Sequence, residues 1–300
     1  MAIGIDDLPA IGFGPGIMRR AASKNTWFPK AFSRFCRAYE HYLIKPRIEE
    51  EFVDSTANAI NSGFRILDYS CSYGDGLLFG KGIKKSGIDR NALFITTRVS
   101  NTAQYSRNIR GEFFRFLERA RIDYVDLLQF HWPVTGYYLD TWHDMESLYE
   151  EGYVKHLGVA NCHPHHLTEL FASCKYRPEI GQFEIHPLLT QKPLIEFYKQ
   201  HGIVVEAYTP IARYDDRLVR LPLLKRLESK YDKTFVQIIL RWHVQNGVIP
   251  IVRSMSKEHQ KEDLDIFDFE LTQEDMAAID AININSRLRY DPDNCDFSIL

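Results

Sequence analysis

The sequence has few cysteines, no long apolar run and no surplus of basic charge. Its five cysteines are odd in number, widely spaced and without a CxxC pair, so we expect reduced thiols in a cytoplasmic protein. No apolar run approaches the ~20 residues that cross a bilayer, and Met1–Asp7 lack the basic and apolar regions of a secretory signal. With 37 basic and 40 acidic residues, the net charge is −3. We therefore expect neither a membrane nor a nucleic-acid partner.

The glycines do not form a dinucleotide-binding fingerprint. The segment Gly12-Phe13-Gly14-Pro15-Gly16 has the wrong spacing, and no helical pattern opens on it. The sequence therefore gives no sign of a Rossmann-type nucleotide site.

What the sequence does contain is a regular alternation of short apolar runs and amphipathic stretches. The 300 residues are 45% hydrophobic and 26% charged, which suits a protein with a large core. Runs typical of buried strands lie at 10–14, 64–68, 93–98, 125–130, 154–159, 180–185, 204–208 and 248–252. Helical patterns follow them at 47–62, 76–86, 106–120, 141–151, 164–174, 193–201, 234–245 and 257–265.

Eight strand–helix units in strict alternation predict a parallel sheet that closes into a barrel. We expect a single α/β domain over residues 1–300, a (β/α)8 TIM barrel with extra helices at 221–231 and 272–283. The polar tail from Ile284 is expected to lie across the surface. In this architecture, chemistry is placed at the carboxyl ends of the strands, so residues at those ends are the candidates for a site.

One inserted segment, 19–46, enlarges the loop after the first strand well beyond the usual length of about two to six residues. It is rich in aromatic residues, namely Trp27, Phe28, Phe32, Phe35, Tyr39 and Tyr42. A disordered chain rarely has such a composition. Two interpretations stay open: a helical flap packed on the side of the barrel, or an aromatic wall over a substrate.

Four polar residues lie at or just beyond the ends of neighbouring strand-like runs. Asp68 ends one run, Tyr73 follows it, Arg98 ends the next, and His131 follows the one after. In a parallel sheet these ends are adjacent, so an acid, a phenol, a cation and an imidazole could form one proton-transfer site. Taken singly, Tyr73 is a core tyrosine and Asp68 with Arg98 a structural ion pair. Their joint placement favours the functional interpretation.

These residue types suit the reduction of a carbonyl group, which needs a hydride on carbon and a proton on oxygen. Tyr73 could donate the proton. A free phenol has a pKa of ~10, and a nearby cation lowers it by stabilising the phenolate. Arg98 could supply that charge while Asp68 holds it in place, and His131 could orient the carbonyl oxygen by a hydrogen bond.

Several separated motifs extend this pattern along the chain. They are Gly63-Phe64-Arg65-Ile66-Leu67-Asp68, Tyr73-Gly74-Asp75, His131-Trp132-Pro133, Gly158-Val159-Ala160-Asn161-Cys162, Gln182-Phe183-Glu184-Ile185-His186-Pro187 and Tyr208-Thr209-Pro210. Together, over nearly the whole chain outside 19–46, they resemble the motifs of the aldo-keto reductase family. The resemblance implies a catalytic tetrad of Asp68, Tyr73, Arg98 and His131.

Arg98 departs from the pattern, because the family has a lysine at this position. Arginine is always charged, is bulkier than lysine and binds carboxylates as a two-pronged fork. A tight fork on Asp68 would leave Tyr73 poorly activated. The sequence therefore also allows reduced activity or an altered substrate.

The resemblance further implies that NADP binds in an extended pose without a glycine fingerprint. Asn161 and Gln182 would grip the carboxamide of the nicotinamide, and the ring of Tyr208 would stack on it. The residues alone leave simpler alternatives open, a helix cap for Asn161 and a polar residue filling the barrel mouth for Gln182.

The other end of the cofactor would lie after the last strand. By resemblance, Arg253, Ser254 and His259 would surround the 2′-phosphate, at a helix start where amides and the helix dipole favour an anion. Glu262 and Asp263 would meet the adenine. These basic residues favour NADP over NAD. The alternative is a solvated helix face with mixed charges.

A metal site is suggested by His163, His165 and His166 beside Cys162. Consecutive residues at a helix start point in different directions, and no second ligand cluster completes the spacing. We therefore expect no metal.

The leading hypothesis is an NADP-dependent reductase that converts a small aldehyde or ketone to an alcohol. Trp132, Tyr137, Tyr138 and the tail are expected to line the substrate pocket, and the chain to be a monomer or a weak homo-oligomer. One alternative is an NADP-binding sensor or regulatory protein whose activity is weak because of Arg98. Another is a barrel of unrelated function, such as an isomerase that uses the same face.

Overall fold

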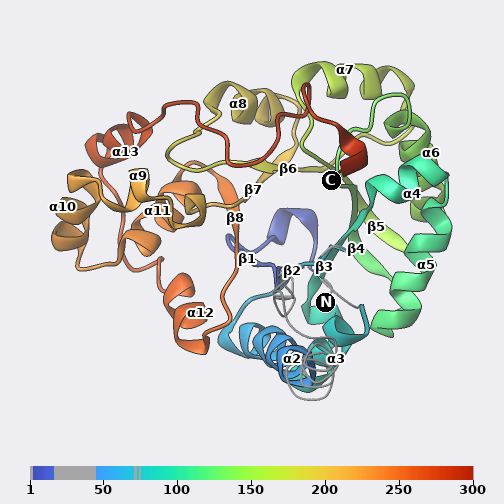
Figure 1. Ribbon diagram of the computed structural model, residues 1–300, viewed down its shortest axis with the longest axis horizontal. Helices are drawn as coiled ribbons and strands as arrows, with labels where there is room; N and C mark the ends of the chain where they lie inside the picture. The colour runs from blue at the N-terminus through green and yellow to red at the C-terminus, as the bar shows by residue number, and fades with distance from the viewer. Residues whose placement is uncertain (1–2, 17–44, 71–72, 74–75, 300) are drawn as a thin grey trace, which may run out of the picture.

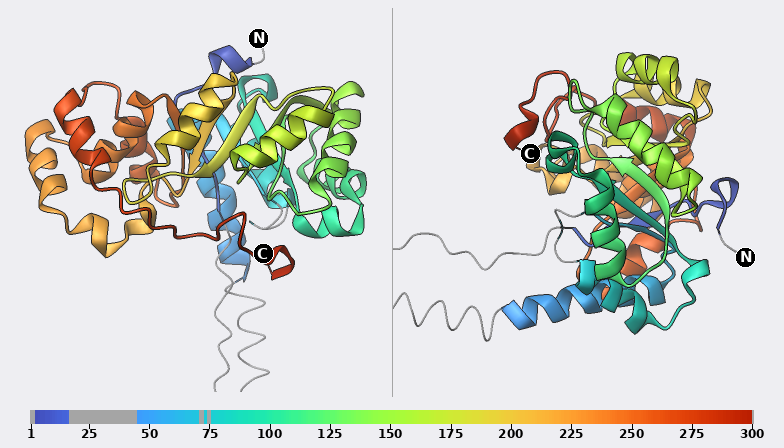
Figure 2. Two further views of the ribbon diagram at one scale, coloured as in Figure 1. Left: turned by 90° about the horizontal axis from the view of Figure 1, so that it is seen from above. Right: turned by 90° about the vertical axis from the view of Figure 1, so that its right-hand side faces the viewer.

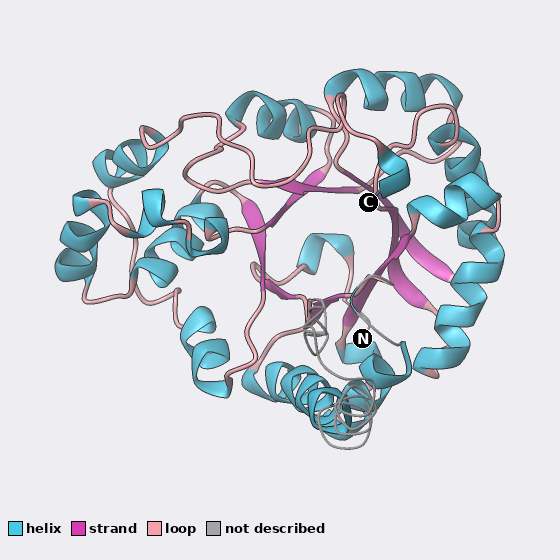
Figure 3. Ribbon diagram, in the orientation of Figure 1, coloured by secondary structure: helices cyan, strands magenta, loops and turns pink. Residues whose placement is uncertain are grey.

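Eight parallel strands form a closed barrel in chain order, with helices around it (Figures 1 and 3). This computed structural model describes residues 3–16, 45–70, 73 and 76–299. The strands are β1 Gly12–Phe13, β2 Ile66–Asp68, β3 Phe94–Val99, β4 Val125–Phe130, β5 Val154–Ala160, β6 Ile180–Glu184, β7 Val204–Tyr208 and β8 Val248–Val252. The helices are α2 Lys45–Ser62, α3 Gly76–Ser86, α4 Asn101–Ser106, α5 Ile109–Ala120, α6 Tyr138–Glu150, α7 Pro164–Ser173, α8 Lys192–Gln200, α9 Asp216–Val219, α10 Pro222–Tyr231, α11 Phe235–Gln245, α12 Lys257–Leu264 and α13 Gln273–Asp280.

The predicted (β/α)8 barrel is confirmed, and β4, β7 and β8 have the predicted bounds. β1 is shorter than expected, with only two residues, yet it closes the ring. Gly12 pairs with Ile66 of β2 on one side and with Ile251 of β8 on the other. A Cβ at Gly12 would lie 2.5 Å from the Ile251 side chain, so this narrow seam admits only glycine.

The helix predicted at 106–120 corresponds to α5, which begins only at Ile109, and the short helix α4 before it was not predicted. The Ser100 side chain accepts the Ala103 N–H and so starts α4, and Arg107 ends it in the left-handed conformation with φ 52°. The short helix α9 was not predicted. The extra helices predicted at 221–231 and 272–283 correspond to α10 and α13.

The barrel interior has an apolar layer and a polar layer. Ile66, Phe94, Leu127, Ile180, Ile249 and Ile251 form a buried cluster. Two residues beyond Ile66 and Ile180 in the strands are Asp68 and Gln182, which therefore point inward at the next level. The interior thus changes from apolar to polar toward the carboxyl ends of the strands, where a site is expected.

The chain termini lie at opposite ends of the barrel (Figure 2). Ile3, Ile5 and Leu8 pack on the apolar interior cluster, whereas residues 284–299, here called the tail, run along the carboxyl ends of the strands. Of the inserted segment predicted at 19–46, all but Lys45 and Pro46 lies outside the described residues, and these two begin α2. Among the described residues, no helix has the length and apolar character needed to cross a membrane.

Candidate active site

The four residues predicted for proton transfer come from neighbouring strands. Asp68 is the last residue of β2, Arg98 is the next-to-last residue of β3, and His131 directly follows β4. Tyr73 lies in the turn after β2, where its amide N–H donates to the Ser70 carbonyl at 2.8 Å. Because β2, β3 and β4 are adjacent in the barrel, all four residues lie at the same mouth.

Asp68 and Arg98 form a buried ion pair. Arg98 Nη2 donates to Asp68 Oδ1 at 2.5 Å, and both side chains are 2% exposed. Arg98 Nη1 also donates to the Tyr69 carbonyl at 3.3 Å. Burial raises the pKa of Asp68, although the Arg98 charge and its hydrogen bond act in the opposite direction. Each partner therefore depends on the other for its charge to be tolerated in the interior.

Arg98 also reaches the far side of the barrel. Its Nη2 donates to Gln182 Oε1 at 2.6 Å, and Gln182 Nε2 donates to Glu206 Oε2 at 2.8 Å. Gln182 and Glu206 are in register on β6 and β7, so both point inward. Because arginine only donates and the carboxylate accepts, the two neighbours fix which way the Gln182 amide faces. Glu206 was not predicted, although a lone acid inside the apolar run 204–208 was a visible signal.

Tyr73 keeps its proton at neutral pH. Burial and the charge of Asp68 raise the pKa of Tyr73 to about 12, while the charge of Arg98 acts to lower it. The net lowering that the sequence led us to expect from Arg98 is therefore wrong for this arrangement, because burial and Asp68 outweigh the arginine. No hydrogen bond joins Arg98 to the Tyr73 hydroxyl within the described residues.

His131 is a neutral imidazole. Burial and then the charges of Arg98 and Arg289 lower its pKa to about 3. A phenol that retains its proton and a neutral imidazole can each present an N–H or O–H to a carbonyl oxygen. At neutral pH the mouth can therefore polarise a carbonyl through His131 and deliver to it the Tyr73 proton, which leaves a phenolate that water must reprotonate.

Replacing Glu206 by glutamine is expected to stabilise the protein at alkaline pH. Burial raises the pKa of Glu206 from 4.5 to about 7, so the folded state holds a proton that the unfolded state has already lost. Wild-type stability therefore falls as pH rises from about 4.5 to about 7, and Glu206→Gln escapes this loss. We expect the variant to gain about 2 kcal/mol relative to wild type between pH 5 and pH 8, measured by urea unfolding.

The neighbouring buried acid offers a control of opposite sign. Burial acts to raise the pKa of Glu184, but hydrogen bonds from His186 and from the amides of Leu288 and Arg289 outweigh it and leave the pKa lowered. Glu184→Gln should therefore lose more stability at pH 8 than at low pH. An equal Glu206→Gln effect at pH 5 and pH 8 would contradict the raised Glu206 pKa.

The predicted nicotinamide residues are joined to each other. The Tyr208 hydroxyl donates to Asn161 Oδ1 at 2.7 Å, and Asn161 Nδ2 donates to the His131 carbonyl at 2.9 Å. Asn161 has a left-handed φ of 59°, a conformation that asparagine tolerates better than most residues. The ends of β4, β5 and β7 are thus tied together. Asn161 is not a side-chain cap of α7, because His163 holds that position.

The predicted phosphate residues follow β8. Arg253 is exposed and packs over Gly16, where a Cβ would lie 2.3 Å from Arg253 Cδ. Gly16 has φ 66°, a left-handed conformation that favours glycine. The guanidinium is thus placed beside the loop that follows β1, with its charge at the surface.

The turn after Arg253 is held rigidly at the start of α12. Ser256 accepts the His259 N–H through its side chain, and Ser254 Oγ accepts the Ser256 N–H at 3.2 Å. Gln260 Nε2 donates to the Ser254 carbonyl at 2.9 Å from inside the protein. The His259 side chain remains exposed. A supported helix start of this kind suits an anion.

The predicted adenine residues differ from each other in burial. Asp263 is 6% exposed, and burial together with the Glu262 charge raises its pKa to about 7. The charges of Asp263 and Glu262 also act on Tyr214, which lies in the loop after β7. This loop therefore comes close to α12. That Glu262 and Asp263 meet adenine stays a prediction.

Trp132, predicted to contact substrate, is covered by the tail. It is 1% exposed, and its ring lies 6.1 Å from that of Phe297, centroid to centroid. Gln104 Nε2 donates to the Trp132 carbonyl at 3.0 Å. The indole N–H is buried without a partner among the described residues. That Trp132 contacts substrate stays a prediction.

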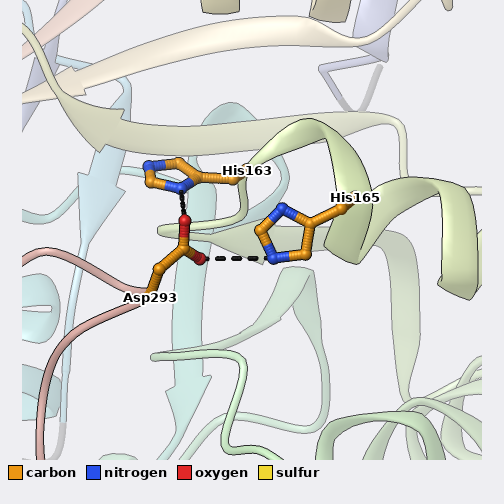
Figure 4. A group of neighbouring side chains, drawn as sticks. All are labelled: His163, His165 and Asp293. Carbon is orange, nitrogen blue, oxygen red and sulfur yellow. Dashed lines mark hydrogen bonds and ion pairs between the residues drawn. The ribbon is translucent and has the colours of Figure 1, made fainter.

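The histidines at the start of α7 gather around Asp293 of the tail (Figure 4). His163 Nδ1 lies 2.6 Å from Asp293 Oδ2, and His165 Nε2 lies 3.2 Å from Oδ1. The argument that these side chains point apart is therefore wrong, since ligand atoms of all three lie within 4.8 Å of one another. Arg287 Nη2 lies 3.1 Å from His163 Nε2, which places the ring proton on Nδ1, toward Asp293.

The fold and this mouth define a class, the (β/α)8 barrels with their chemistry at the carboxyl ends of the strands. A model of the aldo/keto reductase family matches residues 45–284. The chain belongs to this family and is an oxidoreductase that acts on carbonyl groups.

Curated relatives and solved structures agree with the family. Glyoxal reductase of Bacillus subtilis is 40% identical over 82% of this chain and 89% of its own. The 9,11-endoperoxide prostaglandin H2 reductase of Trypanosoma cruzi is 39% identical over 80% and 86%. A crystal structure of a Bombyx mori aldo-keto reductase in complex with NADP has a TM-score of 0.81 at 28% identity and covers 96% of this chain and 94% of its own.

Proposed function

We propose that this protein reduces an aldehyde or ketone to an alcohol with NADPH, and that Tyr73 donates the proton. The observation that carries the proposal is the mouth itself, where a phenol with a pKa of about 12 lies within electrostatic reach of a buried Asp68–Arg98 pair. When bound, NADPH supplies the hydride. Tyr73 delivers its proton to the carbonyl oxygen, and the neutral His131 orients that oxygen by a hydrogen bond.

The residues present suit the cofactor at both of its ends. Asn161 and Tyr208 form a fixed pair at the mouth, which supports a nicotinamide stacked on the Tyr208 ring. Gln182 is held by Arg98 and Glu206, so its share in gripping the carboxamide is limited to its remaining hydrogen-bonding capacity. Arg253 above Gly16 and the supported start of α12 suit the 2′-phosphate.

Two measurements test the proposal. Addition of NADPH should change the fluorescence of the protein or cofactor on binding, and a screen of carbonyl compounds should then give a loss of nicotinamide absorbance. Failure to bind NADPH would overturn the proposal. We place this activity in the cytoplasm, on the grounds of the odd, widely spaced cysteines.

Replacing Arg253 by alanine is expected to weaken NADPH binding about tenfold and NADH binding little, since a charge-assisted bond to the 2′-phosphate is lost. Fluorescence titration of both cofactors measures the two dissociation constants. NADH serves as the internal control, because it lacks the 2′-phosphate. If the binding of NADPH and NADH is weakened equally, Arg253 contacts a part of the cofactor that both share.

A second candidate function is an NADP-binding sensor with weak activity. The observation in its favour is that Arg98 Nη2 is shared between Asp68 and Gln182. If the wild type binds NADPH but reduces nothing, while Arg98→Lys gains reductase activity, the sensor is favoured. Activity in the wild type that Arg98→Lys does not increase would favour the enzyme.

A further inference from the structure

The tail is anchored to the mouth of the barrel by its main chain. The amides of Leu288 and Arg289 donate to the two oxygens of Glu184, at 2.7 and 3.0 Å. Glu184 is the last residue of β6 and is 0% exposed. Arg289 is therefore fixed at the carboxyl end of β6, on the same side of the barrel as the proton-transfer residues.

The rest of the tail continues across the same end. Asp293 meets His163 at the start of α7, and Phe297 covers Trp132 after β4. In Figures 1 and 2 the tail runs along this end of the barrel, opposite the amino-terminal segment. The tail thus borders the mouth from β6 to β4, with Arg289 near its beginning.

The Arg289 guanidinium lies within electrostatic reach of the catalytic groups. Burial is the main cause of the lowered pKa of His131, and the charges that add to it are those of Arg98 and Arg289. The Arg289 charge also acts on Tyr73 and Tyr208, against the effect of burial. Arg289 is half-buried, and the groups that its charge acts on all lie at the mouth.

This cation has no counter-charge in the described part of the chain. No ion pair or side-chain hydrogen bond of Arg289 is found there, whereas Arg287, two residues earlier, contacts both Asp291 and His163. The one carboxylate beside its backbone, Glu184, is already occupied by His186 and the tail amides. The Arg289 guanidinium is therefore available to an anionic ligand at the mouth.

The position of Arg289 favours an anion on the substrate over a phosphate of the cofactor. The proposed phosphate residues follow β8, and the charge of Arg253 acts on Tyr73 but is not among those that act on His131. Arg289 acts on both Tyr73 and His131, the two residues proposed to flank the carbonyl oxygen. Its charge is therefore on the side of the mouth where the carbonyl compound would lie.

We propose that Arg289 binds a carboxylate on the substrate, so that the protein prefers aldehydes or ketones that carry a carboxylate to neutral ones. A planar guanidinium matches a carboxylate by two parallel hydrogen bonds. The inference rests on the proposed reductase function. The carbonyl carbon of the substrate receives a hydride from NADPH, which becomes NADP⁺, and its oxygen receives the Tyr73 proton, which water then replaces. The carboxylate is unchanged throughout.

The test compares 4-carboxybenzaldehyde with benzaldehyde, two substrates that differ by the carboxylate. We expect the wild type to show a kcat/KM at least about tenfold higher for 4-carboxybenzaldehyde, the effect of one charge-assisted pair. Arg289→Gln should remove this preference through KM and keep the turnover of benzaldehyde. Arg289→Lys should retain part of it, because the charge remains. Arg226→Gln, on the exposed side of α10, removes the same charge far from the mouth. It should change neither the preference for 4-carboxybenzaldehyde nor the turnover of benzaldehyde.

Each outcome decides a different point. Benzaldehyde reduction by the wild type without any preference for the carboxylated substrate would overturn the inference and leave the reductase function standing. A preference that survives in Arg289→Gln would overturn the assignment to Arg289. If the wild type binds NADPH and reduces neither these aldehydes nor any carbonyl compound in the screen, the reductase function itself fails, and the inference falls with it.

Discussion

Replacing Tyr73 by phenylalanine is expected to lower kcat for carbonyl reduction by about 10²- to 10⁴-fold, the usual contribution of a positioned acid. The pKa of about 12 means that Tyr73 carries its proton throughout the neutral range, so the hydroxyl is available for transfer in each turnover. Phenylalanine keeps the ring that packs against Tyr69 at 6.3 Å and removes only the donor. The loss should therefore fall on kcat, followed by nicotinamide absorbance, and not on the NADPH dissociation constant.

Tyr124→Phe is the matched control. Tyr124 immediately precedes β4, at the opposite end of the strand from His131, and its hydroxyl donates to Asn91 at 3.1 Å. Removing that hydroxyl should leave kcat within a few-fold of wild type. Full activity in Tyr73→Phe would show that the proton comes from another group.

Replacing Arg98 by methionine is expected to lower the free energy of unfolding by about 3–5 kcal/mol, the range found when one partner of a buried ion pair is removed. Asp68 would keep a carboxylate in a site that is 2% exposed, and Gln182 Oε1 would lose its donor. Urea unfolding measures the change. The double variant Asp68→Asn with Arg98→Met should recover a large part of the loss, because it removes both charges of the pair.

The stability lost in the single variant Arg98→Met should depend on pH in a defined direction. Burial already raises the pKa of Asp68 in the wild type, and removal of Arg98 takes away the charge that opposes this rise. As pH falls through the raised pKa, Asp68 becomes neutral and the penalty disappears. Arg98→Met should thus lie closer to wild type at low pH than at pH 8. A deficit that is equal at all pH values would mean that lost packing, and not the unpaired charge, causes it.

Most of the fold could be predicted, because each strand in this barrel pairs with its neighbours in the sequence. The apolar runs of β4, β7 and β8 end abruptly at polar or turn residues, so even their bounds were correct. The two-residue β1 and the break between α4 and α5 were missed. Both depend on local events that apolar spacing does not record, the tight seam at Gly12 and the left-handed Arg107.

The proposed site could be predicted only in part. Residues at strand ends are visible in the sequence, and the ion pair of Asp68 with Arg98 follows from adjacent strands. The hydrogen bond from Arg98 to Gln182 crosses the barrel interior from β3 to β6. The order of the strands predicts contacts between neighbouring strands only, so it could not predict this one. The dominance of burial in the pKa of Tyr73 is likewise a property of the folded structure. Arg289 comes from a tail whose path is set by Glu184, so its place was hidden from the sequence.

The tail is attached to the barrel in a way that allows its sequence to vary without disturbing the barrel. Its described contacts include hydrogen bonds to Leu188, Glu184 and Asn101, the contacts of Arg287 and Asp293 with His163, and the packing of Phe297. None of these belongs to the pairing of the eight strands. Changes in its length or composition can accumulate without disturbing strand register. The barrel and its proton-transfer residues can therefore stay unchanged while the tail varies. Changes in the tail, in evolution or by protein engineering, would alter which substrates the protein accepts.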